Sequence, residues 1–114
     1  MRMYVLVDKE MPLPSYLKGE ETFAKRKSYN HVQGSHAVAQ FILEHANTSR
    51  IWNNQTLIVL GVSRRQIKFY SKKIIKEGMK FSRFNEPDID YYITAIATVA
   101  NDDQAKMFKR LELL

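Results

Sequence analysis

Unbroken apolar runs and amphipathic stretches alternate along the chain, and this alternation predicts alternating strands and helices. Residues 4–7 and 57–60 are continuous apolar runs, which are typical of strands buried on both faces of a sheet. Two later runs, at residues 79–84 and 93–99, predict a third and a fourth strand. Stretches with helical periodicity lie between the first three runs. We therefore expect helices to connect these strands by crossovers, which favour parallel pairing of the strands.

The helix between the first two strands has two distinct sides. We expect Asn30 to cap its N-terminus and residues 46–47 to lie near its end. Gln33 and His36 are three residues apart and share one side of the helix, because each residue turns by roughly 100°. The opposite side is apolar and is therefore the expected core side; it consists of Val32, Ala39, Ile42, Leu43 and Ala46.

Capping signals predict two further helices. Ser63, with Gln66 three residues later, forms a capping-box signature for the second helix. Asn101 or Asp102 begins a last helix, which we expect to run through a C-terminal extension over residues 101–114. The apolar stripe of this extension fits either burial on the domain's own core or a docking face for a homodimer, and it consists of Met107, Phe108, Leu111 and Leu114.

These elements predict one α/β domain over residues 1–114. Their order favours a three-layer sandwich, in which a small mixed four-stranded sheet has helices on both faces. Residues 9–28 contain Pro12, Pro14 and Gly19 and show no clear periodicity, so we expect a long basic loop insertion there. A chain of 114 residues is long enough for one modest core.

Composition narrows the chemistry. The chain has no cysteine, which excludes a disulfide framework, thiolate catalysis and a cysteine zinc site. Its three histidines lie at spacings that do not put two of them on one helix face as metal ligands. No apolar run approaches the roughly 18 residues of a membrane span. The chain enters a strand almost at once, without a signal peptide, so we expect a cytoplasmic location.

The charge balance points to anionic partners. Lys and Arg outnumber Asp and Glu by 18 to 12, a formal net charge of +6, which favours nucleic acid above all. Lys68 and Lys72 belong to one ridge of the second helix, which suits either a phosphate backbone or a solvated face. A cluster in the predicted loop opens directly into the first helix and is better placed to contact nucleic acid; it consists of Lys25, Arg26 and Lys27.

Four features occur in a particular order. They are an opening strand followed by an acid, the helix motif Gln33-x-x-His36-Ala37, an apolar strand with a helix ending at Gly78, and an acidic turn at 86–88 before a strand beginning at Thr94. Together they resemble the type-2 peptidyl-tRNA hydrolases, which cleave the ester that joins a peptide to its tRNA. The resemblance covers about residues 3–8 and 30–99. It implies a small α/β fold, tRNA as partner, and hydrolysis without a metal or cofactor.

Ester hydrolysis needs a positioned water, a base and donors for the developing oxyanion, and the matched positions offer these groups. Gln33 is suited to orienting water or donating to the oxyanion. Glu86 or Asp88 is the candidate base, provided that burial raises its pKa, and Thr94 is the candidate partner of the acid or the substrate. His36 has two interpretations, a histidine at the core margin bonded to backbone and a residue that lines the site.

One departure from the family's pattern leads to two functional hypotheses. The family has a lysine one helical turn before the motif glutamine, and this chain has Tyr29 there. In an active hydrolase, a cation from the cluster at residues 25–27 would have to take the place of that lysine. The alternative is a family member that has lost its chemistry and binds tRNA or a protein partner.

Overall fold

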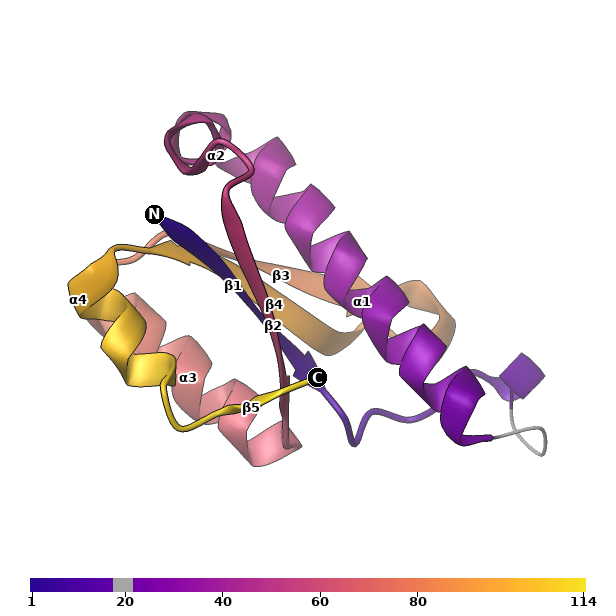
Figure 1. Cartoon of the computed structure of the whole chain (residues 1–114). Helices are drawn as coiled ribbons and strands as arrows, with labels where there is room; N and C mark the ends of the chain where they lie inside the picture. The colour runs from indigo at the N-terminus through magenta and orange to yellow at the C-terminus, as the bar shows by residue number, and fades with distance from the viewer. Residues whose placement is uncertain (18–21) are drawn as a thin grey trace.

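The computed structural model describes residues 1–17 and 22–114, and a mixed sheet runs through them (Figure 1). Across these residues the sheet has five strands in the order β3-β4-β1-β2-β5. β1 and β2 are parallel, whereas every other neighbouring pair is antiparallel. The strands are β1 (Arg2–Asp8), β2 (Thr56–Val62), β3 (Phe81–Glu86), β4 (Tyr92–Ala100) and β5 (Glu112–Leu113).

Helices cover both faces of the sheet, which confirms the predicted α/β sandwich (Figure 1). Side chains of β1 alternate between the two faces: Val5 and Val7 join the core under α1, and Tyr4 and Leu6 join the core under α3. Both faces of β1 are therefore buried. The helices are α1 (Phe23–Glu44), α2 (Ala46–Trp52), α3 (Arg64–Lys76) and α4 (Asp102–Ala105), with short 3-10 turns η1 (Ser15–Leu17), η2 (Pro87–Ile89) and η3 (Lys106–Phe108).

The C-terminal segment is not helical throughout, which corrects one prediction. Asn101 caps α4 through a capping box with Gln104, but the helix soon gives way to η3, and the chain then turns back along the sheet. There β5 pairs with β2, and the Leu114 amide donates to the Val59 carbonyl at 3.0 Å. This edge pairing supplies a fifth strand where four were predicted.

The apolar stripe of this segment packs on the domain's own core. Phe108 is buried, and its ring stacks on the Tyr4 ring with 4.5 Å between the centroids. Met107 and Leu111 pack against the same core, under α3, and Leu114 packs against the core under α1. Of the two interpretations of the stripe, the structure therefore supports burial within the domain.

Helix α1 begins earlier than predicted. Thr22 caps it by accepting a hydrogen bond from the Lys25 backbone amide at 3.1 Å, and the helix starts at the next residue. Asn30, the predicted cap, lies buried inside the helix. The predicted loop over 9–28 therefore ends in helix, and its residues 18–21 lie outside the described residues. The basic cluster at residues 25–27 sits on the first turns of α1 rather than in a loop.

The buried side of α1 is not the predicted one. Gln33, Gly34 and Ala37 are buried, whereas Leu43, on the predicted core side, is 79 % exposed. Close packing is the reason: a Cβ placed on Gly34 would lie 3.2 Å from the Val7 side chain, so a small residue lets the helix backbone approach the sheet. The predicted apolar side is exposed at every position, namely Val32, Ala39, Ile42, Leu43 and Ala46.

Replacing Gly34 by leucine is expected to force α1 away from the sheet. The larger side chain overpacks a contact without spare room, so the free energy of unfolding should fall by about 1–3 kcal/mol. Ser35→Leu, at the next and exposed position, is the control and should change it by less than about 0.5 kcal/mol. Urea denaturation measures both values, and equal stabilities would contradict the close contact.

Candidate functional site

Polar side chains from three elements meet at one end of the sheet. This end holds the carboxyl ends of the parallel strands β1 and β2, the end of β3 and the start of β4. Gln33 from α1, Glu86 from β3 and Thr94 from β4 lie there, and all three are buried. In sheets with parallel strands, ligands bind outside the carboxyl ends of the strands, so the fold favours a site at this end.

A β-bulge aims Thr94 at α1. The register between β3 and β4 shifts after Phe84, and Thr94 is the residue of β4 that is left without a partner. Ala95 belongs to the core under α1, so strict alternation would turn its neighbour Thr94 to the other face. The bulge breaks this alternation, and the Thr94 hydroxyl donates to Oε1 of Gln33 at 2.6 Å.

The Gln33 amide lies between Thr94 and an acid. Because Oε1 accepts from Thr94, the amide nitrogen is left as a donor on the side of the cavity that Glu86 also lines. Glu86 is 7 % exposed; burial and the nearby Asp88 carboxyl raise its pKa, and His36 and Gln33 offset this rise only in part. A carboxyl group whose pKa is raised is suited to general-base catalysis.

A cavity of about 430 Å³ opens beside these groups, and predicted site residues form much of its wall. These residues are Lys25, Gln33, His36, Glu86 and Asp88. The structure thus brings an ammonium, an amide, an imidazole and two acids to one concave surface, while Thr94 supports Gln33. The remaining lining residues are Tyr16, Leu17, Ser28, Tyr29 and Val32.

Tyr29 occupies the position where the resemblance predicts a lysine. It is 7 % exposed, and its hydroxyl has no hydrogen-bond partner among the described residues. Burial raises the pKa of Tyr29 to about 12, and the negative charges of Glu86 and Asp88 add to this effect. The phenol therefore stays neutral at physiological pH, and the cavity has a hydroxyl group where the resemblance predicts a cation.

The three predicted cations of the 25–27 cluster take different positions. Lys25 lines the cavity. Arg26 donates from Nη1 to the Met11 carbonyl at 2.7 Å and so ties the segment after β1 to α1. Lys27 is exposed, with its Nζ 6.0 Å from the centre of the Phe23 ring. Of these three, Lys25 is the one that the structure places at the cavity.

Lys68 and Lys72 are predicted contacts that the structure does not bring to the cavity. Both are exposed on α3, which covers the opposite face of the sheet from α1 (Figure 1). Lys72 lines a separate surface pocket with Phe69 and Lys76. Their regular spacing correctly predicts a shared helix face, but this face belongs to the other layer of the fold.

His36 lines the cavity, which supports the second of its two interpretations. Two further residues near this site, Tyr16 and Asp8, were not predicted as site residues. Tyr16 is exposed in η1, and its hydroxyl donates to Asp88 across a long 3.4 Å. Asp8, fully buried at the end of β1, accepts a hydrogen bond from the Tyr92 hydroxyl at 2.8 Å. Asp8 had a signal in the sequence, as the acid that follows the first apolar run, whereas Tyr16 had none.

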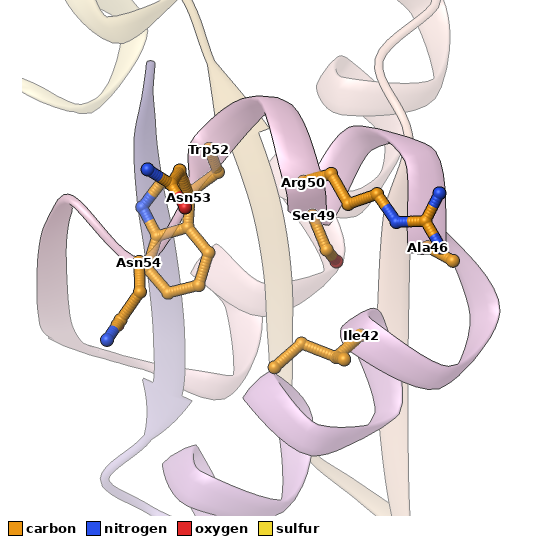
Figure 2. Close-up of a pocket in the computed structure, with 7 residues that line it drawn as sticks. All are labelled: Ile42, Ala46, Ser49, Arg50, Trp52, Asn53 and Asn54. Atoms are coloured by element: carbon orange, nitrogen blue, oxygen red, sulfur yellow. The ribbon is translucent and has the colours of Figure 1, made fainter.

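A second cavity, of about 340 Å³, lies where α1 meets α2 (Figure 2). Trp52, Asn53 and Asn54 border it on one side and Arg50 on the other. The Trp52 indole nitrogen is already satisfied, because it donates to the Thr56 carbonyl at 2.7 Å. The described lining of this cavity includes no Asp, Glu or His, so the first cavity is the better candidate for proton-transfer chemistry.

The comparisons with known proteins name no family for this fold and site. No protein-family model matches the chain, and no curated protein matches its sequence. Within residues 1–17 and 22–114, every helix is too short or too polar to span a bilayer. In the same ranges, no three His, Asp or Glu side chains come together as metal ligands.

Thr94→Val is expected to destabilise the fold by removing the donor to Gln33. The Gln33 oxygen is then buried without a partner, so the free energy of unfolding should fall by about 1–3 kcal/mol. Thr94→Ser keeps the hydroxyl, so its free energy of unfolding should fall much less. Urea denaturation provides the measurement, and a Thr94→Val variant as stable as the wild type would show that the bond contributes nothing.

The matched control is Thr98→Val, on the same strand. Thr98 is equally buried, and its hydroxyl donates to the Lys80 carbonyl at 2.6 Å. This variant should lose a similar amount of stability while leaving the groups around Gln33 in place.

Proposed function

We propose that the protein is a peptidyl-tRNA hydrolase-like esterase, which cleaves the bond between a peptide and its tRNA in the cytoplasm. The observation that carries this proposal is the buried set Thr94, Gln33 and Glu86: Thr94 orients the Gln33 amide, and Gln33 and the buried acid line a cavity with Asp88 and Lys25. Such a set supplies a base beside an amide that is held in one orientation. The ordered resemblance in sequence supports the same reaction.

Glu86 is the proposed general base. Its carboxylate takes a proton from a water molecule, and the water oxygen attacks the carbonyl carbon of the ester. The bond between that carbon and the ribose oxygen then breaks, and Glu86 passes the proton to the leaving oxygen. Gln33 is a positioning residue, because Thr94 orients its amide and leaves the amide nitrogen as a donor at the cavity that Glu86 lines.

The charge of the protein suits an RNA substrate. The formal net charge is +6, Lys25 lines the cavity, and Lys27 is exposed two residues further along α1. Cations placed in this way contact phosphates without reading the sequence. Because such contacts release counterions from the RNA, the proposal includes tRNA affinity that weakens as the salt concentration rises.

A binding module with the same fold is the second candidate. Tyr29 favours it, because a neutral phenol stands where the family has a cation. In this case the cavity holds the end of the tRNA, or a protein partner, without activating water. Salt-sensitive tRNA affinity without any release of the peptide would distinguish this candidate from the hydrolase.

Glu86→Gln is expected to slow the release of a blocked amino acid from its tRNA by about 100-fold or more, because the amide cannot take a proton. Burial no longer opposes a charge in this variant, so its stability at pH 7 should be equal to or above that of the wild type. Single-turnover release and urea denaturation measure the two effects.

Glu77→Gln is the control for this variant, because Glu77 is exposed at the end of α3. It should release the amino acid at the wild-type rate. Equal rates for the wild type and Glu86→Gln would contradict the proposed role of Glu86.

The pH profile of release tests the link between Asp88 and Glu86. Base catalysis needs the carboxylate, so the rate should fall as the pH drops through the pKa of Glu86, which is raised above the ordinary glutamate value. Asp88→Asn removes the negative charge that raises this pKa, so the acid limb should move to lower pH. Asp103→Asn, on α4, is the control and should leave the acid limb of the pH profile in place. An acid limb that does not move in Asp88→Asn would contradict Glu86 as the group whose protonation limits the rate.

A further inference from the structure

His36 and Phe84 form a parallel aromatic pair at the edge of the cavity. Their ring centroids are 4.3 Å apart, and their planes differ by 8°. Phe84 is half-buried against the core under α1, whereas His36 is exposed and lines the cavity. Phe84 therefore covers one face of the imidazole, and the exposed part of the ring borders the cavity.

A second exposed ring borders the same cavity. Tyr16 is 63 % exposed, and a long hydrogen bond of 3.4 Å joins its hydroxyl to Asp88. Proteins that bind single-stranded nucleic acid present aromatic rings of this kind, because every base has a flat face that stacks on them. Of these two exposed rings, that of His36 is better prepared for stacking, because the Phe84 ring lies parallel to it and supports it.

We propose that the His36–Phe84 pair is a stacking platform for the nucleobase at the 3′ end of a single-stranded RNA. The inference rests on the proposed function, in which the ester on the 3′ ribose has to reach Glu86. The base on that ribose then lies within one nucleotide of Glu86. His36 meets this condition, since it lines the same cavity as Glu86.

The charges around the cavity favour a base over a phosphate beside His36. Glu86 and Asp88 repel a phosphate, whereas stacking requires no charge on the ligand. Lys25 lines the cavity from the first turns of α1, eleven residues before His36 and thus roughly 16 Å away along the helix. The phosphates of the preceding nucleotides are therefore expected on the Lys25 side.

The test compares two labelled RNAs on the full chain: a short single strand ending in CCA, and the same strand with an abasic 3′ nucleotide. Stacking of one base changes affinity by about 5- to 150-fold, so the wild type should prefer the intact RNA by a factor in this range. His36→Leu should lose the preference, and His36→Phe should keep it because a ring still covers Phe84. His31→Leu is the control, since His31 is exposed on the same helix but does not line the cavity.

The outcomes separate this inference from the proposed hydrolase. Equal affinity of the wild type for the two RNAs, a preserved preference in His36→Leu, or no RNA binding at all would overturn the platform. If the preference depends on His36 while the wild type releases no amino acid, the platform stands and the hydrolase fails. If release depends on Glu86 while the preference is absent, the hydrolase stands and the platform fails.

Discussion

The buried hydrogen bond from Thr94 to Gln33 is the interaction on which the rest of the site depends. Gln33 is 1 % exposed, and a buried amide costs free energy unless its polar atoms are paired. The bond from Thr94 satisfies the amide oxygen and leaves the nitrogen as a donor at the cavity that Glu86 also lines. Two features of the fold allow this bond: Gly34 lets α1 approach the sheet, and the bulge in β4 turns Thr94 toward the helix.

The strands and helix α3 could be predicted because their signals are local. Apolar runs and the capping box of Ser63 and Gln66 lie within the segments that they specify. The pairing of β5 with β2 could not be predicted, because β5 has only two residues and the strand it pairs with is distant in sequence. Hydrophobic periodicity predicts the wrong buried side for α1, because a helix pressed against a sheet requires small residues at the contact, and Leu43 is left exposed.

Only part of the candidate site could be predicted from the sequence. Gln33 and the acids at 86–88 could be assigned to one site from the order of their motifs, and they do line one cavity. Lys68 and Lys72 follow an equally regular pattern, but spacing along a helix does not determine which face of the sheet the helix covers. Tyr16 and the bulge at Thr94 depend on how distant segments pair, so no local pattern indicates them.

Tyr29 changes the electrostatic basis of the proposed reaction. A lysine at this position would stabilise the Glu86 carboxylate and lower its pKa. The neutral phenol has no such effect, so burial and Asp88 keep the pKa of Glu86 raised. The carboxylate is then a stronger base, and the positive charge that the structure brings to the cavity is that of Lys25. A hydrolase built in this way relies on proton transfer more than on a fixed positive charge, so its rate follows the protonation of one acid.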